Sequence, residues 1–485
     1  MNKATRMLEN TFRLRMADLD TIISDGLCDG GDWCDLYFEF SSFFSLTLRD
    51  SAVTSGGRHE DYGCGIRVLS GEKTGYAYAE TTELKALRNA ARAAASIASG
   101  NAATTATAAF DAAGVTGTAH ELGTSGAGLY PFTQDWRDTE SAAVIPWLNR
   151  LEAEIRRREP RTDKVIAAFN SDVSEVLMYN SLRELCCDLR PMGSIAVTVI
   201  FTSDGRSINN SASRSFRAGA EMLSEALISE LAAEAVEGVD EAFAARRPKG
   251  GKMSVVMGAG ASGILLHEAM GHAFEADFIR KNQSVFSGKI GKRICRRGIT
   301  IVDDGTIPGN RGACNFDDEG VPAQKTAMVT DGVLTSFLHD RISAKFFHLP
   351  PTGNGRRESF RYNPIPRMRA TYMENGSDGT LEDLISSVKK GVYVNRFSNG
   401  QVKIGEGDFT FYVKSGFLIE NGRLTMPVND INIIGNGPRA LADMVAVAGD
   451  LKIDNGQWTC GKEQSVPVSC GIPSVLVENL TVGGE

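Results

Sequence analysis

The chain has 485 residues, of which 42% are hydrophobic and 23% are charged, as in ordinary globular proteins. That length exceeds what one hydrophobic core can hold, so we expect at least two domains. The formal net charge of −8 and the pI near 5.5 provide no basic surface for collecting phosphates, which argues against a nucleic-acid-binding protein.

The N-terminal residues lead directly into an amphipathic stretch and lack the apolar core that a signal peptide requires. No segment approaches the roughly 18 apolar residues of a membrane-spanning helix. The nine cysteines include the adjacent pair Cys186 and Cys187, which is unsuited to a disulfide framework. We therefore expect a cytoplasmic protein with reduced thiols and no membrane association.

The first half of the sequence mixes helical and strand patterns. Apolar residues at helical spacing predict helices over 11–24, 83–99, 141–158 and 216–245. Alternating apolar runs predict strands over 34–48, 65–69, 74–79, 164–170, 175–179 and 194–202. The Ala-, Thr- and Gly-rich stretch 100–118 predicts a loop.

The basic segment 246–252 contains Pro and Gly and is interpreted as a linker, with an ordinary surface loop as the alternative. We therefore predict an N-terminal α/β domain with long helices over residues 1–248. The remaining residues, 249–485, are predicted to form a C-terminal domain of mainly antiparallel β-structure. Together these make an α+β fold.

The second half shows strong turn signals. Asp331-Gly332 and Asn421-Gly422 each separate two short apolar runs, which is typical of two-residue hairpins. Further patterns predict a helix over 438–447 and strands over 253–257, 300–302, 409–413, 431–434 and 474–477. The glycine-rich segment 258–263 lacks the Lys-Ser/Thr ending of a phosphate loop, which favours a tight strand-to-helix turn.

Two of the six histidines lie five residues apart, in the segment His267-Glu268-Ala269-Met270-Gly271-His272. At about 100° per residue, five residues separate two side chains by roughly 140°, so a regular α-helix cannot aim both imidazoles at one ion. We predict either a one-residue π-type bulge, most easily accommodated at Gly271, or a helix that ends before His272. A helix that carries two histidines by coincidence is the alternative to a metal site.

In the metal interpretation, neutral His267 and His272 bind the ion and Glu268 acts as general base on water. A catalytic zinc needs a third protein ligand. Local spacing leaves that ligand open among Glu275, Asp277, His339, His348, Cys460 and Cys470.

Two polar segments are weaker candidates for functional sites. Asn354, Arg356 and Arg357 lie in a glycine-flanked loop and are candidates to contact peptide carbonyls or a tetrahedral oxyanion. The alternative is a solvated surface loop in which Glu358 pairs with one arginine. The cluster Asp317-Asp318-Glu319 is a candidate for a second cation, although an acidic turn is the favoured interpretation.

The segment 263–272 resembles the signature of the TldD/PmbA metallopeptidases, also called modulators of DNA gyrase, and of the TldD branch in particular. The similarity continues in 284–288, 303–305, 317–320, 351–359, 460–462, 465–468 and 480–484. It implies an HExxxH zinc peptidase with a bulged motif helix, with His267, His272 and Cys460 as ligands and Glu268 as base. One departure is that the segment between Lys462 and Ser465 is a residue shorter than is usual in the family.

The resemblance also implies a dimer whose inner cavity admits unfolded peptides. The dimer is either a homodimer or a heterodimer with an inactive PmbA/TldE-type subunit. The predicted function is zinc-dependent hydrolysis of unfolded peptides or peptide precursors. The alternative is a non-catalytic peptide-binding subunit with a structural metal or an empty site. A third hypothesis, a DNA-binding regulator of gyrase, is suggested only by the family's name, and the acidic net charge argues against it.

Overall fold

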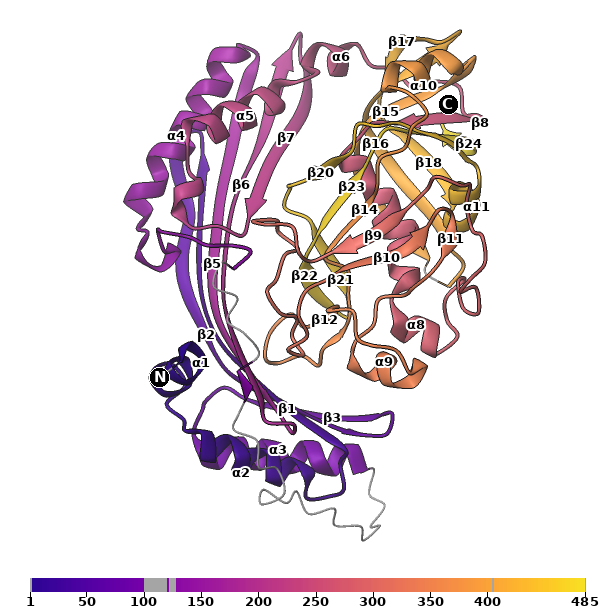
Figure 1. Ribbon diagram of the computed structural model, residues 1–485. Coiled ribbons are helices and arrows are strands. Elements are labelled where there is room, and N and C mark those ends of the chain that lie inside the picture. The colour runs from indigo at the N-terminus through magenta and orange to yellow at the C-terminus, as the bar shows by residue number, and fades with distance from the viewer. Residues whose placement is uncertain (1, 100–119, 122–127, 404, 485) are drawn as a thin grey trace.

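The computed structural model describes residues 2–99, 120–121, 128–403 and 405–484, so most of the predicted loop at 100–118 lies outside the described residues. The chain mixes helices and strands, as predicted. Figure 1 shows a long, curved sheet built by the first half, with the β-rich second half lying against its concave side. None of the described helices is both long and apolar enough to cross a membrane.

The sheet of the first half has the order β3-β2-β1-β5-β6-β4, with β7 also paired to β6. Its strands are β1 Trp33–Arg49, β2 Ala52–Ser70, β3 Lys73–Ala79, β4 His120–Glu121, β5 Thr162–Asn180, β6 Glu184–Ser203 and β7 Arg206–Phe216. The two strands predicted over 164–170 and 175–179 are one strand, β5. They join because the polar residues between them, such as Ser171 and Asp172, keep their pairing with β6.

Two groups of helices cover the two ends of this sheet (Figure 1). One group is α1 Lys3–Asn10, α2 Met16–Leu27 and α3 Leu84–Ser99, and the other is α4 Ser141–Arg158, α5 Glu225–Val236 and α6 Val239–Ala244. Each group buries its own core, the first around Phe12 and Phe38 and the second around Leu148 and Phe169.

Two of the predicted helices in this half are corrected. The helix predicted over 11–24 begins only at Met16, because Arg13 adopts a left-handed backbone conformation with φ of 57°. The helix predicted over 216–245 is two helices. The Ser224 side chain accepts the Leu227 N–H at the start of α5, and Gly238 at φ of 72° separates α5 from α6.

The second half contains a closed barrel. The strands follow the order β15-β8-β24-β18-β16, and β15 also pairs with β16, which closes the sheet on itself. β17 pairs with β16, and β19 with β24. The strands are β8 Gly251–Met257, β15 Lys390–Lys403, β16 Asp408–Glu420, β17 Arg423–Val428, β18 Ile431–Asn436, β19 Met444–Val447 and β24 Val475–Gly483.

A second sheet in this half has the order β11-β10-β9-β14-β23-β20. Its strands are β9 Ile301–Asp304, β10 Lys325–Thr330, β11 Val333–Leu334, β14 Ala370–Met373, β20 Lys452–Asp454 and β23 Ser469–Ile472. The remaining elements include the hairpin β21 Thr459–Lys462 and β22 Gln464–Pro467, the pair β12 Gly355–Arg356 and β13 Ile365–Pro366, and the helices α8 Ala276–Arg280, α9 Arg341–Phe347 and α10 Leu381–Ser387.

Both predicted hairpins are confirmed, and in each turn both central residues have positive φ, as such turns require. The helix predicted over 438–447 is only partly right. Helix α11 covers Gly437–Ala442, and the following residues form β19 because Met444, Ala446 and Val447 pair with β24. Tertiary pairing therefore overrides the helical pattern at this end.

Buried charges join the two halves. The fully buried Arg67 of β2 places its guanidinium nitrogens 2.6 Å from carboxylate oxygens of both Asp35 and Glu319. Arg190 of β6 is likewise 2.6 Å from Asp318. Asp317 accepts the backbone N–H groups of Glu319, Val321 and Gly355. The cluster Asp317-Asp318-Glu319 thus lies in an acidic turn whose carboxylates are used by arginines and amides.

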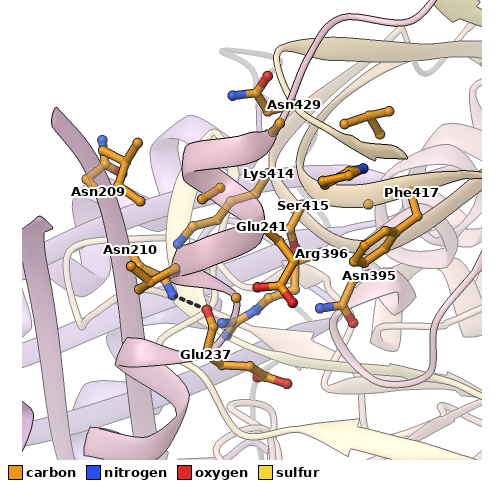
Figure 2. Close-up of a pocket in the computed structure, with 18 residues that line it drawn as sticks. Asn209, Asn210, Glu237, Glu241, Asn395, Arg396, Lys414, Ser415, Phe417 and Asn429 are labelled. Atoms are coloured by element: carbon orange, nitrogen blue, oxygen red, sulfur yellow. Dashed lines mark hydrogen bonds between the residues drawn. The ribbon is translucent and has the colours of Figure 1, made fainter. Parts of the chain in front are cut away.

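The halves also meet at the other end of the sheet, around a pocket of about 180 Å³ (Figure 2). Asn210 donates to the backbone carbonyl of Glu237 there, and the Lys414 amine donates to the Ser211 hydroxyl at 2.8 Å. Burial lowers the pKa of Lys414 to about 8, and the nearby Arg396 acts in the same direction. The buried residues of the two large cores of the first half end at Val239, and those of the largest core of the second half begin at Val255. The domain boundary at 248/249 stays a prediction.

Replacing Arg67 by methionine should lower the free energy of unfolding by about 3–5 kcal/mol, because two buried carboxylates lose their nearest counter-ion. Chemical denaturation of the full chain measures this change. As a matched control, Arg92→Met removes an arginine whose side chain is 52% exposed and which pairs with Asp25, so it should cost less than about 1 kcal/mol. Equal stability of the two variants would contradict a structural role for the buried pairs.

Candidate metal centre

The two motif histidines lie in a distorted helix between β8 and β9. After β8 the chain turns at Gly260, with φ of 90°, and enters the short α-helix α7 Ile264–Leu266. The next segment, His267–Gly271, is π-helical, and the N–H of His272 donates to the carbonyl of His267 five residues back. The π-type distortion predicted from the histidine spacing is therefore confirmed, and it brings both imidazoles to one side.

Gly271 serves a different purpose from the one expected. Its φ of −58° and ψ of −49° are ordinary right-handed values, so the bulge does not use the conformational freedom of glycine. A Cβ at this position would lie 2.1 Å from the sulfur of Met368. A side chain at this position would have to displace the end of the buried Met368 side chain, which accounts for glycine here.

The structure brings His267, His272 and Cys460 together. Their candidate ligand atoms all lie within 4.8 Å of one another, and among the described residues no other group of His, Cys, Asp and Glu does so. The two imidazole rings are 5.1 Å apart, and the Cys460 sulfur is 3.3 Å from Nε2 of His272. Cys460 comes from the β21–β22 hairpin, which turns tightly at Glu463, with φ of 60°. The shortened segment noted in the sequence thus forms this turn and leaves Cys460 beside the histidines.

The electrostatics of this group favour a thiolate. Burial alone would raise the pKa of the Cys460 thiol, but the two histidines, His267 above all, outweigh burial and lower it to about 4. Both ring nitrogens of His267 are buried and have no hydrogen-bond partner among the described residues. A thiolate together with imidazole nitrogens is a donor set that zinc prefers, so the residues present fit such an ion.

Glu275 lies directly behind His272. Its Oε2 is 3.0 Å from Nδ1 of His272 and 3.0 Å from the Lys462 amine, and the carboxylate is fully buried. Burial raises the pKa of Glu275, but Lys462 and His272 outweigh it and lower that pKa to about 2. Glu275 therefore lies where it orients His272, with Nε2 directed at Cys460. Its position three residues after His272, one helical turn on, is a signal that sequence reasoning could have used.

Arg367 holds the hairpin that presents Cys460, and no feature of the sequence pointed to it. Its fully buried guanidinium donates to the backbone carbonyls of Cys460 at 2.7 Å and Gln464 at 2.8 Å. Arg367 thus fixes the position of the cysteine through the main chain.

Glu268 differs from its neighbours because its side chain is half-buried and makes no hydrogen bond or ion pair among the described residues. Its carboxylate is therefore free to accept a proton. This is the property that a general base beside the histidines requires.

The other sequence candidates for the third ligand lie apart from this group. Asp277 pairs with Lys462 at 2.8 Å, and His348 is exposed after α9. His339 is buried against Phe347, and burial lowers its pKa to about 4. Cys470 lies in β23, where burial raises the pKa of its thiol well above the ordinary value.

The loop with Asn354, Arg356 and Arg357 is buried, which corrects the alternative of a solvated surface loop. Asn354 donates to Asp303 and to the carbonyl of Arg367, and Arg356 donates to the carbonyls of Met368 and Pro467. Arg357 donates to the carbonyl of Asp318. Glu358 forms no ion pair with an arginine among the described residues, and its carboxylate instead accepts the N–H of Ser465.

Three sequence profiles of one family match the chain. The PmbA/TldA metallopeptidase domain 1 matches residues 34–98, the central domain matches 134–241 and the C-terminal domain matches 250–484. The "Metalloprotease TldD homolog" of Haemophilus influenzae is 37% identical over 93% of this chain and 93% of its own length. The "Zinc metalloprotease TldD homolog" of Saccharolobus solfataricus is 34% identical over 49% of this chain and 53% of its own length.

Several solved structures share the fold, two of them as follows. A protein from Thermotoga maritima, named for modulation of DNA gyrase, has a TM-score of 0.75 and 21% identity, covering 96% of this chain and 99% of its own. TldE from Thermococcus kodakarensis has a TM-score of 0.75 and 19% identity, covering 96% of this chain and 100% of its own.

Replacing Glu275 by glutamine should weaken zinc binding about 10–100-fold, because His272 loses the carboxylate that orients it and makes it more basic. Competition with a chromogenic chelator measures the affinity. Glu420→Gln, at an exposed position of β16, is the matched control and should bind zinc like the parent. Unchanged affinity in the Glu275 variant would remove the proposed link between the two residues.

Gly271→Ala should destabilise the fold by about 1–3 kcal/mol, since its methyl group overlaps the Met368 sulfur. The double variant Gly271→Ala/Met368→Ala should be more stable than the sum of the two single changes predicts, because removing the sulfur relieves that overlap. Chemical denaturation measures all three variants. Gly461→Ala in β21, where a Cβ meets nothing within 4 Å, is the control, and strict additivity would show that the contact is not the cause.

Proposed function

Because the chain belongs to the PmbA/TldD metallopeptidase family, we propose that it is a zinc-dependent peptidase that hydrolyses unfolded peptides or peptide precursors. The observation that carries this proposal is the convergence of His267, His272 and Cys460, with their ligand atoms within 4.8 Å of one another. The zinc in the name of the Saccharolobus solfataricus relative supports the choice of metal.

In this proposal, His267 and His272 bind the ion through imidazole nitrogens and Cys460 binds it through its thiolate. Zinc, when bound, supplies a Lewis acid that polarises a peptide carbonyl and makes water more acidic. Three protein ligands are the number that leaves a catalytic zinc one open position. Glu275 holds the His272 ring so that Nε2 remains directed at the site.

Glu268 is the proposed general base. Its carboxylate accepts a proton from the attacking water as the oxygen of that water bonds to the scissile carbonyl carbon. The same carboxylic acid then gives the proton to the departing amine as the C–N bond breaks, which returns Glu268 to its ionised form. A half-buried carboxylate that has no ion pair within the described part of the chain suits both transfers, because no such pair has to be broken first.

Several further features belong to the same proposal. We place the HExxxH segment in a C-terminal domain of residues 249–485, which follows an N-terminal domain of residues 1–248. A dimer, with a second copy or with an inactive PmbA/TldE-type subunit, is supported by the shared fold of TldE. A cytoplasmic location is supported by nine cysteines that are all free thiols. Asn354, Arg356 and Arg357 stay candidates for substrate binding.

Glu268→Gln should lower the hydrolysis of an unfolded peptide by at least about 100-fold while zinc content, measured by metal analysis, stays near the parent value. His272→Ala and Cys460→Ser should lose both zinc and activity. The control is Glu478→Gln, at an exposed position in β24. Equal hydrolysis by the parent and by Glu268→Gln would contradict the role of Glu268 as general base. A zinc-containing parent that hydrolyses no peptide, alone or with a partner subunit, would favour a non-catalytic peptide-binding subunit.

A further inference from the structure

A cavity of about 220 Å³ lies between the curved sheet and the β21–β22 hairpin. Strands β1, β5 and β6 form one wall. The other wall comes from the second half, where Arg356, Thr459 and Ser465 are among the lining residues. Thr459 directly precedes Cys460 in β21, and successive residues of a strand are only about 3.3 Å apart along the chain. One short strand therefore borders both this cavity and the candidate metal centre.

The cavity is rich in guanidinium groups. Six arginines and four acidic residues line it. The guanidinium groups of three of the arginines, Arg311, Arg356 and Arg369, form no ion pair among the described residues and donate only to uncharged oxygens. Burial and neighbouring arginines lower the pKa of Arg356, and burial lowers that of Arg311 to about 10, which shows how unfavourable these unpaired charges are.

Arg217 is the arginine of this cavity whose side chain has the fewest polar contacts among the described residues. It is only 7% exposed, it lines the cavity, and its buried Nε has no hydrogen-bond partner. Within the described part of the chain, its guanidinium contacts the ring of Tyr130 and makes no ion pair. An arginine side chain carries five N–H donors that fit a carboxylate in a two-pronged arrangement, and those of Arg217 form no hydrogen bond among the described residues.

The acidic residues of the cavity do not fill this role. Asp318 pairs with Arg190, Glu39 accepts the N–H of Phe360 and the Ser41 hydroxyl, and Glu358 accepts the N–H of Ser465. The Asp172 carboxylate has no hydrogen bond or ion pair among the described residues, and burial raises its pKa to about 6 despite Arg217 and Arg311. The lining therefore carries six guanidinium groups against four carboxyl groups, so the cavity retains an excess of positive charge.

We infer that this cavity binds a carboxylate group of the peptide substrate, either its C-terminus or an acidic side chain, through Arg217 with Arg311 and Arg356 nearby. The inference rests on the proposed peptidase function for the identity of the ligand. A peptide whose chain runs along the β21–β22 hairpin would place its carboxylate in the cavity and a neighbouring peptide bond near the metal centre. The cavity would then set the register of the substrate. It would also give the enzyme a preference for acidic or terminal residues at a fixed distance from the cleaved bond.

The test compares binding of three fluorescent forms of one short alanine-rich peptide to the Glu268→Gln protein. One form has a free C-terminus, one has a C-terminal amide, and one has the amide and a single internal glutamate. At least one carboxylate form should bind about tenfold more tightly than the neutral amide. The preference should persist when zinc is removed with a chelator, because the cavity, and not the metal, binds the carboxylate.

Arg217→Gln should abolish this preference with little effect on the neutral amide, and Arg217→Lys should retain part of it. Arg49→Gln, an exposed arginine of β1, is the charge-matched control and should leave the preference intact. Equal binding of all three peptides to the Glu268→Gln protein, or a preference unchanged by Arg217→Gln, would overturn the inference. Failure of the peptidase proposal is a separate result, since it appears as absent hydrolysis by the parent and leaves these binding constants measurable.

Discussion

The spacing between His267 and His272 is the constraint on which the rest of the site depends. Five residues cannot place two imidazoles on one side of a regular helix, and the π-helical segment removes that mismatch. The wider turn must fit into a crowded core, where a Cβ on Gly271 would overlap the sulfur of Met368. Met368 is the neighbour of Arg367, which anchors the cysteine hairpin. Two adjacent residues thus support the site: Met368 packs against the distorted motif, and Arg367 fixes the position of Cys460.

The site is also assembled from distant parts of the chain. Cys460 is 188 residues from His272, and it reaches the histidines only when the β21–β22 hairpin is held by Arg367. Lys462, two residues after Cys460 in the same hairpin, neutralises Glu275, and Glu275 in turn orients His272. The hairpin therefore contributes both a donor sulfur and the cation that stabilises the carboxylate behind the imidazole. Metal binding at such a site is coupled to the folding of the whole second half.

Buried charges determine how the two halves fit together. Where each guanidinium has a carboxylate, as in Arg67 with Asp35 and Glu319, the contact is structural and fixes the second half against the sheet. The pattern differs at Arg217, Arg311 and Arg356, which line a cavity and form no ion pair with any carboxylate that the structure describes. Proteins rarely bury unpaired charge without a use for it, because its desolvation is costly. The arginines that pair with carboxylates, such as Arg67, hold the two halves together. The arginines that line the cavity are the ones we propose to bind a ligand.

Local features of the sequence determined several elements of the fold and the distortion at the motif. The Asp-Gly and Asn-Gly turns, the helix Ser141–Arg158 and the π-type bulge all depend on contacts between residues a few positions apart, and such contacts can be read from spacing and residue type. The sequence also supplied the six candidates for the third ligand, but their spacing could not choose among them, and only the family resemblance singled out Cys460.

Tertiary structure decided the rest. It made one strand of the two predicted in β5, turned residues 444–447 from helix to strand, and placed Glu275 behind His272. It also brought arginines from opposite halves of the chain to one cavity. These outcomes depend on pairing and burial between segments far apart in the chain, and no local pattern encodes which distant partner a residue will meet.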